Sequence, residues 1–384
     1  MKKTESNKDS INSAAPSRGL LHPEKPLEDD ARDTALRPRS LAEFLGQKAI
    51  KENLAVFIEA AKERNESLDH LFLIGPPGLG KTTLAQVVAH ELGADFKVTS
   101  APALEKPKDL AGILTTLTEK TVFFIDEIHR LKPAIEEMLY IAMEDYELDW
   151  IIGQGPSART IRIPVQPFTL VGATTKAGNV SSPLISRFGI TCRFSFYENE
   201  AMEAIVRRSA GILGVSIDDD AAALLAKSAR GTPRVVNRLL RRVRDFAQIF
   251  AAQTFTTQKP AINAASVDAA PARAVSNKKT ASPRITKQIV EESLARLEID
   301  PLGLERYDRE ILKIIIERYG GGPVGAETLA ISIGESVDTL EDYYEPYLIQ
   351  TGLLQRTPRG RMVTSLAYEY LKIPQGKETG GLLF

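Results

Sequence analysis

A run of glycines that ends in a lysine and a threonine is the strongest sign of chemistry in this sequence. It reads Gly-Pro-Pro-Gly-Leu-Gly-Lys-Thr over residues 75–82 and matches the phosphate-binding pattern G-x-x-x-x-G-K-[ST] at every fixed position. Glycines let the backbone curl so that several N–H groups point at one phosphate chain. We therefore expect ATP here, with Lys81 on its β- and γ-phosphates and Thr82 on Mg²⁺.

Two adjacent carboxylates, Asp126 and Glu127, supply the second part of such a site. They follow the apolar run 122–125, which predicts a buried strand, and open α/β sheets bind ligands at this end of their strands. We expect Asp126 to coordinate Mg²⁺ and Glu127 to orient and polarise the attacking water. An Asp-Glu pair alone is a weak signal, but its place after the phosphate loop predicts ATP hydrolysis.

Three further positions carry groups that suit phosphate chemistry. Thr174 or Thr175, at the end of another apolar run, is expected to hydrogen-bond the γ-phosphate or the water, and we name Thr175. Arg187 lies beside apolar residues and is expected to stabilise the transferring phosphate of a neighbouring subunit, unless it is an ordinary surface ion pair. Arg234 opens a helix behind Pro233 and is expected to reach the phosphates from a second domain.

These side chains need a sheet to bring them together. Apolar runs at 71–74, 96–99, 122–125 and 168–172 read as buried strands and alternate with helical segments. This pattern predicts an α/β fold, with a parallel sheet covered by helices on both faces.

Beyond residue 183 the sequence becomes mostly helical, and its end reads as helices followed by a short hairpin. Helices and a hairpin in this order predict a winged helix, which is usually a nucleic-acid module. We divide the chain into a disordered leader at 1–33, a large ATPase domain at 34–197, a small helical lid at 198–299 with a flexible insertion at 254–284, and a winged-helix domain at 300–384.

Composition limits the remaining possibilities. The chain has 384 residues and a net charge of -1, so any binding of nucleic acid must use a local patch. Cys192 is the only cysteine, which excludes an intramolecular disulfide, and no Cys/His group has zinc spacing. Neither a membrane-spanning run nor a signal peptide is present, which favours a cytoplasmic protein with no membrane partner.

The order of the motifs resembles AAA+ ATPases, and a narrower set of segments resembles the RuvB family of Holliday-junction branch-migration motors. Ile185 departs from that family, which usually has an arginine there, and the insertion is also atypical. The resemblance covers about residues 34–250 and 285–372. It rests on Leu36-Arg37-Pro38, Phe44-Leu45-Gly46-Gln47, Asp126-Glu127-Ile128-His129-Arg130, Gly172-Ala173-Thr174-Thr175 and Arg356-Thr357-Pro358-Arg359-Gly360-Arg361.

The resemblance implies roles for individual residues. Arg187 would be the finger that acts on a neighbouring subunit, and Arg234 would be the sensor in the lid. Three arginines crowd into the C-terminal hairpin with no acid between them, as binding to DNA phosphates requires. The nucleotide site would take Leu36 and Arg37 at the adenine, Gly78, Gly80, Lys81, Thr82 and Thr83 at the phosphates and Mg²⁺, and Glu144, Asp145, Tyr146 and Tyr197 along the pocket; Arg356, Arg359 and Arg361 would contact DNA.

The resemblance also implies partners. It predicts a homohexamer that moves double-stranded DNA at Holliday junctions, together with RuvA and the RuvC resolvase. RuvA would dock on a β-hairpin predicted at 148–163, where Ile151 and Ile152 either contact the partner or pack under the sheet.

Two other functions fit parts of the sequence. A clamp loader or replication initiator would use the same nucleotide site to load a partner, without translocating. A winged-helix transcription factor would read a DNA sequence and hydrolyse little ATP. Glu127 and Arg187 argue against the transcription factor, and the two hairpins favour the motor.

Overall fold

The computed structural model describes residues 35–152, 159–257 and 283–374. The predicted leader, most of the insertion and the turn of the 148–163 hairpin lie outside these residues. The chain divides into two compact units, residues 1–37 and 38–384. The elements below all belong to the second unit. Within the described part of the chain, no helix is both long and apolar enough to span a membrane.

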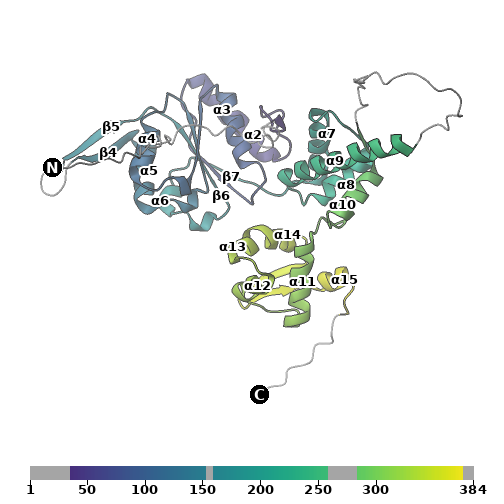
Figure 1. Cartoon of the computed structure of the whole chain (residues 1–384). Coiled ribbons are helices and arrows are strands. Elements are labelled where there is room, and N and C mark those ends of the chain that lie inside the picture. The colour runs from purple at the N-terminus through teal and green to yellow at the C-terminus, as the bar shows by residue number, and fades with distance from the viewer. Residues whose placement is uncertain (1–34, 153–158, 258–282, 375–384) are drawn as a thin grey trace, which may run out of the picture. The chain divides into compact units, whose positions relative to one another are not determined.

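A five-stranded parallel sheet forms the centre of the large domain (Figure 1). Its strand order is β2-β3-β6-β1-β7, so the strands that carry the predicted site residues are neighbours. Every residue of β1 and β6 is buried, as their apolar composition predicts. The strands are β1 (Leu71–Ile74), β2 (Phe96–Ser100), β3 (Val122–Asp126), β6 (Thr169–Thr174) and β7 (Ile190–Arg193).

Helices cover both faces of this sheet and confirm the predicted fold class. Two hydrophobic clusters lie on opposite faces, one with side chains of α2 and α3 and the other with side chains of α4 and α5. The helices are α2 (Lys48–Arg64), α3 (Lys81–Leu92), α4 (Pro107–Leu114), α5 (Pro133–Glu144) and α6 (Ser182–Ile185), with 3-10 turns η1 (Ala101–Ala103), η2 (Ile128–Arg130) and η4 (Ala177–Asn179).

The prediction of a buried strand at 96–99 was wrong in one respect. This segment is β2, but Lys97 and Val98 are exposed, because β2 is the edge of the sheet. Strand β7, at the other edge of the sheet, was not predicted from the sequence. Its side chains alternate between buried and exposed, so it lacks a continuous apolar run.

The predicted β-hairpin is present as a separate two-stranded sheet, β4 (Glu147–Ile152) and β5 (Arg159–Pro164). Trp150 packs partly against the large-domain core. The side chains of Ile151 and Ile152 lie outside the described part, so their role stays a prediction.

In its described residues, 198–257 and 283–299, the lid contains four helices and a small parallel sheet. Its long helix α9 extends through residue 257, so the first residues assigned to the insertion are helical. The elements are α7 (Asn199–Ile212), β8 (Ser216–Ile217), α8 (Asp219–Ser228), α9 (Pro233–Thr257), β9 (Arg284–Ile285) and α10 (Lys287–Arg296).

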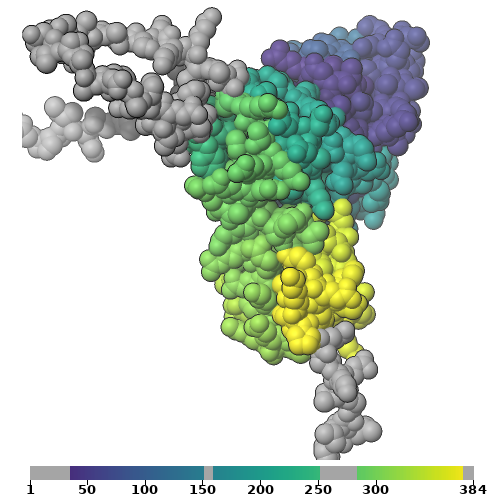
Figure 2. All heavy atoms as spheres, turned by 90° about the vertical axis from the view of Figure 1, so that its right-hand side faces the viewer, coloured from purple at the N-terminus to yellow at the C-terminus, as the bar shows by residue number. Residues whose placement is uncertain are grey.

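The C-terminal domain has its own core and the predicted order of helices and hairpin. Figure 2 shows α11, in green, beside the yellow segment that carries the hairpin and the last helix. The elements are α11 (Arg306–Tyr319), α12 (Ala326–Ile333), α13 (Val337–Thr339), the π-helical turn η5 (Leu340–Tyr344), α14 (Glu345–Gln350), β10 (Leu354–Thr357), β11 (Gly360–Val363) and α15 (Ser365–Leu371).

Candidate functional site

The glycine-rich loop joins the carboxyl end of β1 to the first residue of α3. Gly78 and Gly80 have φ angles of 81° and 98°, a left-handed region that glycine adopts without a steric penalty. Close packing also excludes a side chain, because a Cβ at Gly78 would lie 2.8 Å from Cγ2 of Thr232. The loop ends at the amino terminus of α3, where backbone N–H groups and the helix dipole attract anions.

Lys81 is a buried cation at this helix terminus. Its residue is 8% exposed, and its Nζ donates hydrogen bonds to the carbonyls of Gly75 and Pro76 at 2.6 and 2.9 Å. The Lys81 pKa is lowered to about 8, mainly by burial and also by the Arg234 charge, while the charges of Asp126 and Glu127 oppose this shift. The amine is thus held among neutral carbonyls, where the negative charge of a phosphate would stabilise it.

Asp126 is the last residue of β3 and Glu127 follows it, so both lie at the carboxyl ends of the strands, as the phosphate loop does. Oδ1 of Asp126 accepts the N–H of Glu127 at 3.0 Å, and the Glu127 carboxylate accepts a hydrogen bond from Arg130 at 3.1 Å. Glu127 has a φ of 50°, which turns the chain sharply after the strand. The Thr82 hydroxyl and the Asp126 carboxylate offer the oxygen ligands that Mg²⁺ prefers, and Mg²⁺ usually takes few protein ligands and adds substrate phosphates.

The two threonines at the carboxyl end of β6, Thr174 within the strand and Thr175 after it, differ in their surroundings. Thr174 is 1% exposed; its Oγ1 lies 3.0 Å from Nδ1 of His129 and accepts the N–H of Lys176 at 3.0 Å. Thr175 is half-buried. His129 was not predicted to have a role, although it lies two residues after Glu127 in the segment that resembles RuvB. Burial lowers the His129 pKa, which favours its neutral form.

Replacement of each threonine by valine is expected to separate their roles. Thr175→Val should lower ATP turnover about 10- to 100-fold with little change in melting temperature, because it removes a hydroxyl from the reacting groups. Thr174→Val should lower the melting temperature, because it leaves the N–H of Lys176 and the ring of His129 without their buried partner. Steady-state turnover and thermal unfolding of both variants check this, and a stable but inactive Thr174→Val protein would reverse the assignment.

Arg234 and Tyr197 reach the phosphate loop from the lid and from its junction with the large domain. The backbone N–H of Arg234 donates to the carbonyl of Gly78 at 3.3 Å. The Tyr197 hydroxyl donates to the carbonyl of Leu79 at 3.0 Å, and burial raises the Tyr197 pKa. Leu36 and Arg37 belong to the other compact unit, so their role at the adenine stays a prediction.

Arg187 lies near the amino ends of the strands, whereas the phosphate loop lies at their carboxyl ends. It borders a hollow together with Asp69, His70, Tyr146 and Gly189. Asp69 and His70 precede the first residue of β1, and Gly189 precedes the first residue of β7. Strand β1 has four residues, and at roughly 3.3 Å per residue its amino and carboxyl ends lie about 13 Å apart. Arg187 therefore faces away from the phosphate loop of its own chain.

The Arg187 side chain is oriented by its neighbours. It donates to the Pro183 carbonyl at 2.8 Å and to the Glu144 carboxylate at 3.1 Å, and its Cζ lies 4.8 Å from the centre of the Tyr140 ring. Its Nε is buried with no hydrogen-bond partner in the described part of the chain. The structure thus brings Glu144, Tyr146 and Arg187 together, and not beside Lys81.

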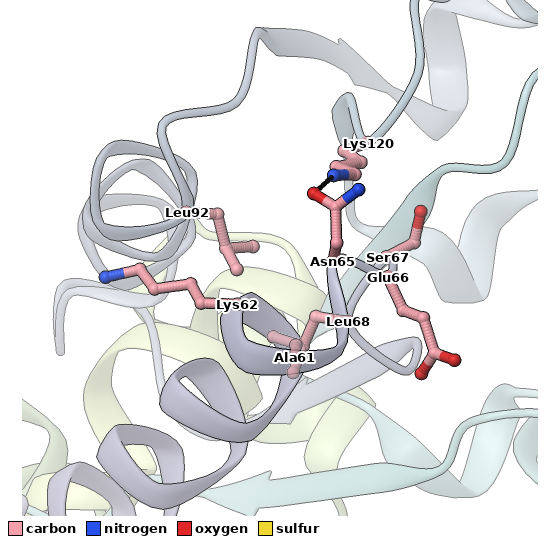
Figure 3. Close-up of a pocket in the computed structure, with 8 residues that line it drawn as sticks. All are labelled: Ala61, Lys62, Asn65, Glu66, Ser67, Leu68, Leu92 and Lys120. Atoms are coloured by element: carbon pink, nitrogen blue, oxygen red, sulfur yellow. Dashed lines mark hydrogen bonds between the residues drawn. The ribbon is translucent and has the colours of Figure 1, made fainter.

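A second, smaller hollow lies next to this one. Figure 3 shows its lining, in which Lys120 donates a hydrogen bond to Asn65. The two hollows share Ser67 and Leu68, and Oγ of Ser67 is buried without a partner among the described residues. The two hollows therefore adjoin at these two residues.

The three hairpin arginines have different environments. Arg361 is buried: its Nε donates to Glu345 at 2.7 Å, and its Nη2 donates to Glu341. The Arg356 side chain is 48% exposed, and its Nη2 donates to Glu345 at 2.5 Å. Arg359 is exposed in the turn between β10 and β11. The carboxylates therefore hold Arg361 and partly hold Arg356, whereas Arg359 points its charge to solvent.

We expect the arginines to separate in function as well. Arg359→Ala should weaken binding to double-stranded DNA at all sequences and reduce the slope of log K against log salt by about 1, with unchanged stability. Arg361→Ala should instead lower the melting temperature, because it leaves buried Glu345 with fewer partners. Salt titrations of DNA binding and thermal melts check both, and an equal loss of stability in the two variants would refute the distinction.

Comparison with known proteins matches the whole arrangement. Three family models cover the described domains: the Holliday junction DNA helicase RuvB P-loop domain over residues 36–194, the RuvB AAA lid domain over 197–268 and the RuvB C-terminal winged helix domain over 301–372.

Individual relatives agree. A RuvB described as a Holliday junction branch migration complex subunit from Treponema denticola is 65% identical over 94% of this chain and 97% of its own length. The corresponding Treponema pallidum protein is 63% identical over 92% of each chain. A solved structure described as the Thermotoga maritima RuvB Holliday junction branch migration motor is 46% identical, with a TM-score of 0.75 over 88% of this chain and 99% of that one. The chain belongs to the RuvB family.

Proposed function

We propose that this chain is an ATP-driven motor that moves double-stranded DNA and thereby drives branch migration of Holliday junctions. The observation that carries the proposal is the division of the predicted catalytic groups between the two ends of the parallel strands. Lys81, Asp126 and Glu127 lie at the carboxyl ends of the strands, and Arg187 lies near their amino ends. A complete site therefore needs two copies of the chain, which suits a ring.

Each copy would supply one half of every site. The loop around Gly78 and Lys81 binds the phosphates of ATP, while Glu127 orients the attacking water. Arg187 of the next subunit, supported by Glu144, stabilises the charge that develops on the transferring phosphate. Tyr146, beside Arg187, would contact the same nucleotide from the neighbouring subunit, and Asp145 would accompany it.

Magnesium fits the residues at the carboxyl ends of the strands. Thr82 and Asp126 would hold it, with Thr83 next to them on α3. When bound, the ion neutralises phosphate charge during transfer. Burial of Lys81 within reach of the Asp126 charge supports a site built for a polyanion with its cation.

The winged helix would hold the DNA. Arg359 and the exposed part of Arg356 would bind phosphates, with Arg361 keeping the hairpin on Glu341 and Glu345. Phosphate contacts carry no base sequence, which a translocating motor requires. The domain as a whole has more acids than bases, so DNA contact would be confined to this hairpin.

Partners and location complete the proposal. A homohexamer would enclose DNA, RuvA would dock on the β4–β5 hairpin, and RuvC would act on the same junction in the cytoplasm. The name of the Treponema denticola relative, a branch migration complex subunit, supports a partner protein.

The test is branch migration of a synthetic four-way junction by the full chain with purified RuvA and ATP. We expect wild type to convert the junction, and Glu127→Gln to bind ATP and DNA without converting it. Glu137→Gln, an exposed carboxylate on α5, is the matched control and should behave as wild type. Wild type that hydrolyses ATP but never moves the junction would instead indicate a loader or a switch.

A further inference from the structure

A buried arginine outside the nucleotide site joins the lid to the winged helix. The side chain of Arg230 is 7% exposed, and its Nη2 donates to Oδ2 of Asp308 at 2.5 Å. Its Nε donates to the Gly303 carbonyl at 2.6 Å, and its Cζ lies 5.0 Å from the centre of the Tyr347 ring. Arg230 is thus a lid residue whose guanidinium is held by residues beyond 300.

Burial of the Arg230–Asp308 pair carries a large desolvation free energy. The Asp308 side chain is fully buried, and its Oδ1 has no hydrogen-bond partner in the described part of the chain. Burial raises the Asp308 pKa, while the Arg230 charge and the N–H of Glu305 at 2.7 Å lower it. A buried ion pair rarely adds net stability over apolar residues, so its value here lies in fixing one geometry between two domains.

The same short segment also contacts the phosphate loop. Gly231 has a φ of 60°, and its carbonyl accepts the N–H of Tyr197 at 2.9 Å. A Cβ at this glycine would lie 2.8 Å from the Tyr197 carbonyl, so the approach is close. Three residues later, Arg234 bonds the carbonyl of Gly78. Residues 230–234 therefore contact the winged helix at one end and the phosphate loop at the other.

We propose that Arg230 is a positioning residue that couples the nucleotide state of the loop to the grip of the winged helix on DNA. A shift of Gly78 and Arg234 on binding or loss of the γ-phosphate moves residues 231–234. Because Arg230 is clamped by Asp308 at the first turn of α11, the winged helix moves with them. Without this clamp the lid responds to nucleotide while the DNA-binding hairpin does not. This inference rests on the proposed function.

The coupling is measured as the ratio of duplex-DNA affinities in a non-hydrolysable ATP analogue and in ADP. We expect wild type to show a ratio within the range of about 5- to 150-fold that is usual for coupled sites. Arg230→Ala/Asp308→Ala, which removes both charges and leaves neither buried alone, should bring the ratio to about one. Its DNA affinity without nucleotide and its ATP hydrolysis without DNA should stay near wild type.

Two further variants separate coupling from folding. Arg238→Ala removes a half-exposed lid arginine that pairs with Glu305 at 3.1 Å across the same junction, and it should keep the wild-type ratio. Arg230→Lys keeps a buried charge but lacks the rigid planar guanidinium whose Nε and Nη2 bond Gly303 and Asp308 in a fixed geometry, so it should show a reduced ratio. If the double variant proves unfolded by circular dichroism, the lysine variant decides the question.

A wild-type ratio in a folded double variant, or in a folded Arg230→Lys variant, would overturn the coupling role while leaving the motor intact. A wild-type chain that shows neither DNA-dependent ATP hydrolysis nor junction migration would overturn the proposed function and this inference with it.

Discussion

Replacement of Lys81 by methionine is expected to abolish ATP hydrolysis while making the nucleotide-free chain more stable. Methionine has a similar length but no charge, so the phosphates lose their buried cation and turnover should fall at least about 1000-fold. The same change relieves the folded chain of a desolvated ammonium group. Loss of the hydrogen bonds to Gly75 and Pro76 offsets part of this gain, which leaves about 1–2 kcal/mol at pH 7.

The pH dependence of that gain has a definite sign. The Lys81 pKa is about 8 in the folded chain and 10.5 in the reference state, so the unfolded chain binds more protons between these values. Wild-type stability therefore rises relative to Lys81→Met as pH increases from about 8 to 10.5. Chemical unfolding of both proteins at a series of pH values measures the difference, with Lys62→Met, an exposed lysine, as the control. A constant difference across this window would contradict a buried, depressed lysine.

Replacement of Arg187 by alanine is expected to reduce ATP turnover by about 1000- to 100,000-fold, the range found for arginine fingers. Nucleotide binding should remain, because the phosphate loop lies at the other end of the strands. The melting temperature should change little, because the ion pair of Arg187 with the half-exposed Glu144 is a surface pair. Nucleotide titration and steady-state turnover of the variant check this, with Arg242→Ala, a mostly exposed lid arginine, as the control.

Mixing two inactive variants shows which chain Arg187 serves. Lys81→Met subunits retain the arginine, and Arg187→Ala subunits retain the phosphate loop. If the finger acts between subunits, an equal mixture should regain activity at about a quarter of its interfaces, where each partner contributes its intact half. If Arg187 acted within its own chain, the mixture would stay inactive.

Much of the fold followed from local patterns. The phosphate loop, the neighbouring strands and the winged helix are marked by apolar runs and turn residues, and these signals lie within a few neighbouring residues. Lys97 and Val98 show the limit, because a strand's place at the edge of a sheet depends on which strands pair, and that is not encoded within the strand itself. The length of α9 was missed because its last residues, Thr-Phe-Thr-Thr at 254–257, are weak helix formers and carry no local signal for a helix.

The candidate site divides in the same way. Roles for Lys81, Asp126 and Glu127 could be predicted from sequence because phosphate chemistry requires those residue types at fixed distances from a strand end. The sequence could not place Arg187 near the amino ends of the strands, nor show that Arg361 is buried against Glu345 while Arg359 is exposed. Arg230 left no signal at all, because its partner Asp308 lies 78 residues away.

The sequence by itself thus determined which chemistry to expect of this chain, because a phosphate loop, a carboxylate pair and an arginine-rich hairpin follow one another along it. Only the tertiary structure decided how those parts cooperate. The parallel strands place the phosphate loop at their carboxyl ends and Arg187 near their amino ends, and a buried ion pair joins the lid to the winged helix. Such relations depend on contacts between residues far apart in the chain, and no local pattern of residue types records them.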